Sequence, residues 1–265
     1  MNYIFSYVNL FVNKVYIRGG IFIKGLFITG TDTDVGKTVA STLLTGYLKQ
    51  KGVKIASYKP VQSGADTLHG KLAAPDVEFY KLANPELNDK EAYTYLFKKA
   101  CSPHLAAREE GIRIEQEKII DHYKQLEAKS DLVLIEGAGG VIVPLTDAGY
   151  SMLDLMKELA VPAVVVARTG VGTINHTVLT VDKLKQEGVP VAGVVMNRLH
   201  IGDPAVELDN QWMIEKLTKV PVIGVIPYMD NPAEAIKNPS LLEKVFSKFD
   251  ILEEIAIDKQ SSSFR

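Results

Sequence analysis

The segment GLFITGTDTDVGKTVAS, residues 25–41, contains residue types that could bind phosphate groups. Gly30 and Gly36 permit a tight loop in which successive backbone N–H groups point towards an anion. Lys37 would add a positive charge, and the Thr38 hydroxyl is suited to Mg²⁺. Five residues separate the two glycines, one more than in the common phosphate-binding loop, so the pattern predicts a variant of that loop.

Other segments carry charged residues that phosphoryl transfer could use. In LVLIEGAGG, Glu136 follows an apolar run and would suit nucleotide-bound Mg²⁺; the alternative is a carboxylate that caps a turn. In KPVQSG, Lys59 would stabilise charge that develops on a transferred phosphoryl group; the alternative is a surface lysine. Asp76, in AAPDVEF, is by itself best interpreted as the N-cap of the next helix.

The elements that must position these residues can be read from the alternation of apolar runs and helical patterns after Gly25. Several of the runs are continuous, as in a parallel sheet that is covered on both faces. The predicted strands are Leu26–Thr29, Lys54–Tyr58, Leu132–Ile135, Ala163–Ala167, Val191–Met196 and Val222–Ile226. The predicted helices are Thr38–Lys51, Ser102–Glu110, Glu115–Ala128, Met152–Leu159, Asn175–Glu187 and Glu207–Lys219. We therefore predict an α/β fold with a doubly wound, mostly parallel sheet and helices on both faces, of the P-loop NTPase type.

Polar clusters follow the predicted strands directly, which bears on where a ligand would bind. They are GTDTDVGKT, KPVQSG, EGAGG, NR at residues 197–198, and PYMDNP. Loops are polar in most proteins, but ligands of such sheets bind beyond the carboxyl ends of the strands. Five clusters on that edge favour one binding site there.

The predicted organisation is one domain, residues 25–250, with residues 1–24 as an appendage outside the core and residues 251–265 as a tail. In the leader the positive charges follow the apolar run, unlike a secretory signal, and asparagines interrupt the run, unlike a membrane span. The formal net charge of −2 gives no indication of nucleic-acid binding. The single cysteine, Cys101, excludes an intramolecular disulfide, so we expect a cytoplasmic protein. From the net charge and the leader, we expect neither nucleic acid nor a membrane as a partner.

Taken together, these segments resemble the dethiobiotin synthetase family. The similarity runs from Gly25 to about Asn231 and rests on GTDTDVGKT, YKPVQSG, SPHLAA, EGAGGVIVPL, GTINHTVLT, VVMNR and GVIPYMDNP, in that order. The long phosphate loop resembles the form of the motif that is typical of this family, so we interpret the additional residue as a family feature. The 24-residue leader and the apolar approach to Asp76 depart from the family pattern.

The resemblance implies a role for each matching position. For ATP it implies Asp34, Val35, Gly36, Lys37, Thr38, Val39, Glu136, Gly137, Ala138, Gly139, Asn197, Arg198, Pro227, Tyr228 and Met229, with Asn197 on the adenine. For Mg²⁺ it implies Thr38, Asp76 and Glu136; for the diamine substrate, Thr33, Ser63, Gly172, Thr173, Ile174 and Asn175. Lys37 and Lys59 would be the catalytic residues. In the family the helix start at residues 172–175 reaches substrate bound to the partner subunit, which implies a homodimer.

The implied reaction is the ATP-dependent carboxylation and ring closure of 7,8-diaminononanoate (7,8-diaminopelargonate) with CO₂ to dethiobiotin, which gives ADP and phosphate and belongs to biotin biosynthesis. Two rival interpretations remain. A cobyrinate-type amidotransferase synthetase would also need a glutaminase domain with a nucleophilic cysteine. A partitioning-type ATPase switch usually has an additional lysine early in the phosphate loop, where this chain has Thr31 and Asp32.

Overall fold

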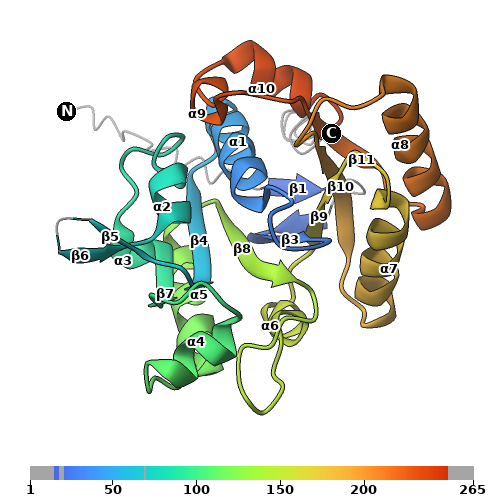
Figure 1. The fold of residues 1–265 in the computed structure, drawn as a ribbon. Coiled ribbons are helices and arrows are strands. Elements are labelled where there is room, and N and C mark those ends of the chain that lie inside the picture. The colour runs from blue at the N-terminus through green and yellow to red at the C-terminus, as the bar shows by residue number, and fades with distance from the viewer. Residues whose placement is uncertain (1–14, 18–20, 69, 250–265) are drawn as a thin grey trace, which may run out of the picture.

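The computed structural model describes residues 15–17, 21–68 and 70–249 (Figure 1). Within them a seven-stranded sheet has the order β11-β10-β9-β3-β8-β4-β7, and every pairing in it is parallel. In that order the strands are Val222–Ile226, Val191–Asn197, Ala163–Arg168, Gly25–Gly30, Leu132–Gly140, Ile55–Gln62 and Tyr93–Leu96. The predicted parallel α/β fold is confirmed.

Helices cover both faces of this sheet, and each face has its own apolar core. One core joins the sheet to α1 (Lys37–Gln50), α9 (Pro232–Ala235) and α10 (Pro239–Val245). The other joins it to α4 (Pro103–Glu109), α5 (Gln116–Lys129), α6 (Met152–Leu159), α7 (Thr173–Gln186) and α8 (Pro204–Thr218). Figure 1 shows α7 and α8 side by side beyond β10 and β11. The short helices α2 (Pro75–Tyr80) and α3 (Asp89–Ala92) lie near β4 and β7.

The strand β4 is longer than predicted, and this corrects the position of Lys59. We predicted that the strand ends at Tyr58, with Lys59 in the following loop, but β4 continues to Gln62. Its first half pairs with β8, and its second half, from Lys59, pairs with β7. The sequence prediction did not include β7, so the second half of β4 had no expected partner. Lys59 therefore sits on a fixed strand.

The strand β8 is also longer than predicted, because it continues past Ile135 to Gly140. Its glycine-rich end follows β3 through a register shift, and Gly140 pairs with Gly30. Glu136 thus lies inside a paired strand, next to the phosphate loop. Glu136 pairs with Ile28 of β3, and Ile135 before it pairs with both β3 and β4, so the backbone that carries the Glu136 side chain is fixed.

Two small antiparallel sheets accompany the main one: β1 (Val15–Ile17) with β2 (Ile21–Ile23), and β5 (Asp66–Leu68) with β6 (Lys71–Ala73). Ile23, which we assigned to the leader, is buried in the core on the α1 face. The predicted roles of residues 1–14 and 18–20, and of the tail 251–265, fall outside the described residues.

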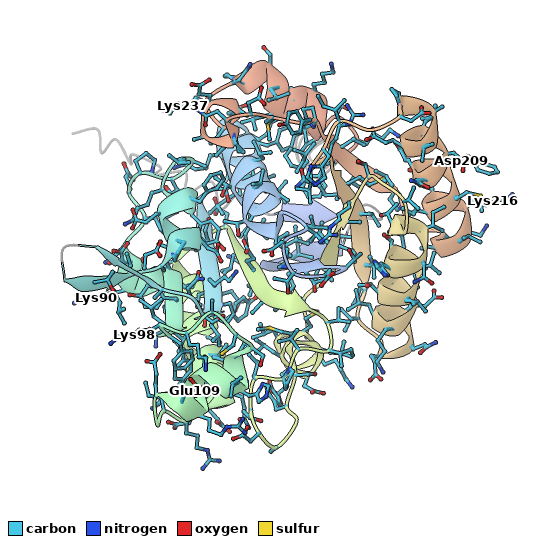
Figure 2. All side chains as sticks on the ribbon, viewed as in Figure 1. Lys90, Lys98, Glu109, Asp209, Lys216 and Lys237 are labelled. Carbon is cyan, nitrogen blue, oxygen red and sulfur yellow. The ribbon has the colours of Figure 1, made fainter. Side chains whose placement is uncertain are left out.

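The surface carries most of the charge. Figure 2 labels Lys90, Lys98, Glu109, Asp209, Lys216 and Lys237 on the periphery, and all six are exposed. In the part of the chain that the structure describes, none of the helices has the length and apolar character needed to cross a lipid bilayer. Lysine side chains usually lie at the surface, so the buried Lys37 and Lys59 near the phosphate loop are exceptions that call for a functional explanation.

Candidate active site

The phosphate loop owes its shape to backbone conformations at its end. Asp34 and Gly36 have φ angles of 55° and 89°, and Gly36 is the residue from which α1 begins. A Cβ atom on Gly36 would lie 2.0 Å from Nδ2 of Asn197, so only glycine fits. The Asn197 amide donates to the Val35 carbonyl at 3.0 Å and ties the loop to the end of β10. The first N–H groups of α1 thus face the loop, as an anion site requires.

Five side chains from four elements meet beyond this loop. The Thr38 hydroxyl lies 2.9 Å from Oδ1 of Asp76 and 2.8 Å from Oε1 of Glu136. The Lys59 ammonium lies 2.8 Å from the same Glu136 oxygen and also contacts Asp76. Lys37 folds back and donates to the Asp32 carbonyl at 2.9 Å. The residues predicted for phosphate and Mg²⁺ binding, which come from separate segments, are therefore close together in space.

These residues line a cavity of about 670 Å³, large enough for a nucleotide phosphate chain and a small substrate. From the predicted site it is lined by Thr33, Asp34, Gly36, Lys37, Thr38, Lys59, Ser63, Asp76, Glu136, Ala138 and Gly139. Sequence reasoning gave no role to its other lining residues, Gln62, Gly64, Pro75, Ala100, Cys101, Ser102, Pro103 and Val143. Several of them lie inside the quoted segments YKPVQSG, SPHLAA and EGAGGVIVPL, but none has a charged side chain, so nothing in the sequence indicated a role for them.

The charges in the cluster determine each other's ionisation. Burial acts to lower the pKa of Lys59, but Glu136 and Asp76 outweigh it and hold that pKa above its usual value. Burial acts to raise the pKa of Asp76, but the Lys59 ammonium outweighs it and lowers that pKa. Burial, and then the charge of Lys59, lower the pKa of Lys37. An added phosphate anion would raise the pKa of Lys37 again and favour its charged form, so the site favours an anionic ligand.

Asp76 does not have the capping role that its local sequence suggests. Pro75 takes the first helical position of α2, so the residue before it, Ala74, is the N-cap. Asp76 instead lies in the first turn and directs its carboxylate to Thr38 and Lys59. The interpretation as a helix cap is therefore wrong, and the role of Asp76 as a Mg²⁺ ligand stays a prediction.

The donor set around Thr38 fits Mg²⁺. A hydroxyl and two carboxylates converge on one point, and the structure places a cation there, the Lys59 ammonium. Hard oxygen ligands of this kind, completed by phosphate oxygens, are those that Mg²⁺ prefers. No group of three or more His, Cys, Asp or Glu side chains that could hold a metal occurs among the described residues, so at this site the Thr38 hydroxyl would have to serve as the third protein ligand.

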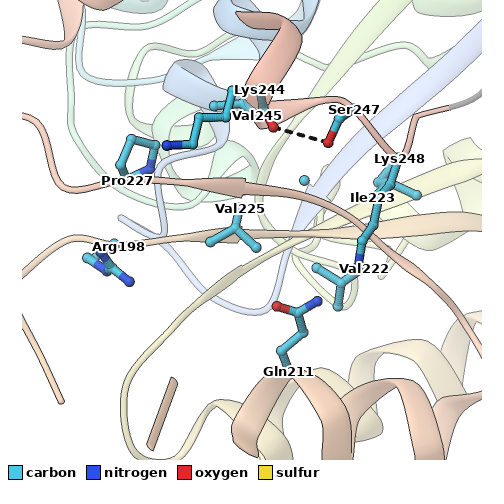
Figure 3. Close-up of a pocket in the computed structure, with 11 residues that line it drawn as sticks. Arg198, Gln211, Val222, Ile223, Val225, Pro227, Lys244, Val245, Ser247 and Lys248 are labelled. Atoms are coloured by element: carbon cyan, nitrogen blue, oxygen red, sulfur yellow. Dashed lines mark hydrogen bonds between the residues drawn. The ribbon is translucent and has the colours of Figure 1, made fainter. Parts of the chain in front are cut away.

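Five residues expected to bind ATP, Asn197, Arg198, Pro227, Tyr228 and Met229, do not line the phosphate cavity. Arg198 and Pro227 line a second cavity of about 370 Å³ beside β11, together with Lys244 and Lys248 (Figure 3). Tyr228 is 40% exposed, and Met229 packs on the core of the α1 face. Of this group, the structure joins Asn197 to the phosphate loop. Contact of the others with a nucleotide base stays a prediction.

The segment from Gly172 to Asn175, expected to contact substrate, is at the start of α7 and does not line the phosphate cavity. Val171 beside it is 96% exposed, and Asn175 is also exposed. Two other predicted positions, Val35 and Val39, direct their side chains to the apolar core, so only their backbone is available to a ligand. Gly137 packs against Phe27, where a Cβ atom would lie 2.8 Å from the ring.

The parallel sheet, the phosphate loop on β3 and the adjoining lysines and carboxylates define a nucleotide-binding protein of the P-loop class. A family model described as an AAA domain matches residues 24–235. The chain is 44% identical over 230 residues to the ATP-dependent dethiobiotin synthetase BioD of Halalkalibacterium halodurans, covering 87% of this chain and 95% of the relative. It is 48% identical over 208 residues to the enzyme of the same name from Anoxybacillus flavithermus, covering 78% and 93%. The chain belongs to the ATP-dependent dethiobiotin synthetase family, which confirms the resemblance seen in its motifs.

A solved structure of a ParA family ATPase from Chlorobium tepidum TLS is more distant. It matches with a TM-score of 0.49 and 14% sequence identity, over 85% of this chain and 90% of that one.

Proposed function

We propose that this protein catalyses the ATP-dependent ring closure of 7,8-diaminononanoate with CO₂ to dethiobiotin, releasing ADP and phosphate, in biotin biosynthesis. The observation that carries the proposal is the meeting of Lys37, Lys59 and Glu136 at one cavity behind the phosphate loop. The family membership supplies the substrate class.

The proposed chemistry needs positioning and charge neutralisation more than it needs a protein nucleophile. One amine of the diamine takes up CO₂ and gives a carbamate, whose oxygen attacks the γ-phosphorus of ATP and expels ADP. The second amine then attacks the carbonyl carbon of the mixed anhydride, loses a proton and expels phosphate, which closes the ring. Lys37 and Lys59 would stabilise the transferred phosphoryl group, and Thr33 and Ser63 would contact the diamine.

The proposal includes Mg²⁺ held by Thr38, Asp76 and Glu136. When bound with ATP, the ion would neutralise phosphate charge and orient the triphosphate. The Lys59 ammonium now contacts both carboxylates, and in the loaded site these carboxylates would serve the metal while Lys59 turns to the phosphoryl group.

The proposal also includes a homodimer in the cytoplasm. The start of α7 lies outside the phosphate cavity of its own chain, so it is available to the substrate site of a second copy. Exposed apolar residues near that helix and near the phosphate loop, Ile142, Val171 and Leu179, are of the kind that an interface covers.

The test is an incubation of the purified protein with ATP, MgCl₂, bicarbonate and the diamine, followed by mass detection of the cyclic urea. We expect product only when all components are present, and ATP hydrolysis that depends on the diamine. Hydrolysis at the same rate without the diamine, and no cyclic urea, would favour an ATPase switch and overturn the proposal.

A further inference from the structure

The helix α2 sends two side chains, not one, into the active-site cluster. Asp76 and Tyr80 are four residues apart, so they lie one above the other on the same face. Asp76 reaches Thr38 and Lys59, as described above. Tyr80 is 1% exposed, and its hydroxyl donates to Oε2 of Glu136 at 2.7 Å. No sequence motif pointed to Tyr80, and the proposed reaction gives it no direct contact with substrate.

The two oxygens of Glu136 have different partners. Oε1 faces Thr38 and Lys59, where the metal would bind, and Oε2 accepts from Tyr80 on the other side. The last torsion of a glutamate side chain is broad, so a carboxylate without a second partner can rotate. The Tyr80 hydroxyl is the donor in this hydrogen bond, and Oε2 of Glu136 accepts it.

We propose that Tyr80 is a positioning residue: its hydroxyl holds the Glu136 carboxylate so that Oε1 is presented to Mg²⁺. This inference rests on the proposed magnesium site. The Tyr80 hydroxyl also fixes the positions of the two carboxylates relative to each other, because α2, which carries Asp76, contacts Glu136 through Tyr80. Groups that hold a metal-ligating carboxylate from behind act on metal affinity without touching the metal.

A purely structural role is the competing interpretation. The Tyr80 ring packs with Ala74, Val77 and Ala92 in a small buried cluster, and phenylalanine would keep that packing. Tyr80→Phe therefore removes the hydroxyl alone. Tyr58 offers a matched control, since it is also fully buried and its hydroxyl bonds Thr94 and the Ile119 carbonyl, away from the metal ligands. Tyr58→Phe loses a buried hydroxyl of the same kind.

The experiment measures Mn²⁺ binding by electron paramagnetic resonance in the presence of a non-hydrolysable ATP analogue, with the full-length chain. For Tyr80→Phe we expect Mn²⁺ to bind about 10-fold to 100-fold more weakly, the usual effect of losing such a partner. Turnover at saturating diamine should fall, while the KM for the diamine stays unchanged. Replacing Tyr80 by 4-aminophenylalanine, which keeps a donor on the ring, should restore much of the Mn²⁺ affinity. Tyr58→Phe should bind Mn²⁺ as the unsubstituted protein does.

Unchanged Mn²⁺ affinity in Tyr80→Phe, or an equal loss in Tyr58→Phe, would overturn this inference alone. Should Tyr80→Phe not fold, the 4-aminophenylalanine variant decides: near-normal affinity supports the inference, and a large loss contradicts it. Failure of the unsubstituted protein to bind Mn²⁺ with the analogue would overturn the magnesium site, and this inference with it.

Discussion

Lys59 is the residue that balances the charge of the active-site cluster. Its ammonium neutralises two carboxylates that would otherwise face each other in a buried place. Breaking a buried pair by removing one partner leaves an uncompensated charge and is strongly destabilising. The same ammonium is one of the two cations proposed for phosphoryl transfer. The residue thus connects stability without ligand to catalysis with it.

Removal of either lysine should slow turnover sharply. We expect Lys37→Ala and Lys59→Ala each to lower kcat by about 100-fold or more, the effect of losing one preorganised stabilising group. Lys98→Ala, at an exposed position, is the control and should leave kcat unchanged. Steady-state formation of the cyclic urea measures both effects. Near-normal kcat in both active-site variants would remove their catalytic role.

The ion pair also predicts how stability depends on pH. Lys59→Met should reduce the free energy of unfolding of the ligand-free protein at pH 7 by about 3 to 5 kcal/mol. Because the folded-state pKa of Asp76 is lowered, the stability from this pair is present above the unfolded pKa, near 3.8, and is lost as the pH falls through the folded pKa. The difference between variant and unsubstituted protein should therefore shrink as the pH falls below about 4. Urea titrations across that range measure it, and a constant difference would contradict the assignment.

At the scale of elements, α1 is flanked by two glycines with positive φ, one before its start and one after its end. Gly36 begins α1 with φ of 89°, and Gly52 follows its end with φ of 82°. Their surroundings differ, because Gly36 is pressed against Asn197, whereas a Cβ atom on Gly52 would have no heavy atom within 4 Å. A substitution at Gly52 would therefore strain the backbone alone, whereas one at Gly36 would also disturb the phosphate site.

Substitution of the two glycines should have different consequences. Gly36→Ala must displace Asn197 or the loop, so we expect at least a 10-fold loss of ATP affinity, by analogy with other disrupted site supports. Gly52→Ala should cost about 1 to 2 kcal/mol of stability through its left-handed backbone and keep ATP affinity. Calorimetric titration with an ATP analogue, paired with thermal unfolding, tests both variants. Equal ATP affinity in the two would argue against Gly36 shaping the phosphate site.

The whole molecule presents two surfaces that matter for the proposal, the phosphate cavity and the exposed start of α7. The homodimer proposal brings them together, because the α7 start of one chain would complete the phosphate cavity of the other. The exposed apolar residues Ile142, Val171 and Leu179 lie near these surfaces and are candidates for the contact.

Complementation between two inactive variants tests this arrangement. Lys59→Ala removes a cation from the cavity, and Asn175→Asp places a negative charge at the α7 start, where a substrate carboxylate is proposed to bind. Co-expression should restore activity to about a quarter of the unsubstituted level, because half of the dimers are hybrids and each hybrid has one intact shared site. Activity no higher than in either variant alone would show that each chain completes its own site.

The sequence by itself determined the fold class, the longer secondary-structure elements and the phosphate loop. The reason is that buried strands read as continuous apolar runs and long helices as periodic ones, signals that need no knowledge of neighbours. Met152–Leu159 and Val222–Ile226 have the predicted bounds for this reason. Gly30, followed by Gly-Lys-Thr at residues 36–38, is likewise a local signal.

Only the tertiary structure decided how Lys59, Asp76 and Tyr80 act. Lys59 belongs to a strand because β7, distant along the chain, pairs with it, and Asp76 turns to the site because α2 packs beside Thr38. Tyr80 stands out only through its contact with Glu136, 56 residues away. Contacts between distant segments leave no periodic trace in the sequence, so these assignments needed the folded chain.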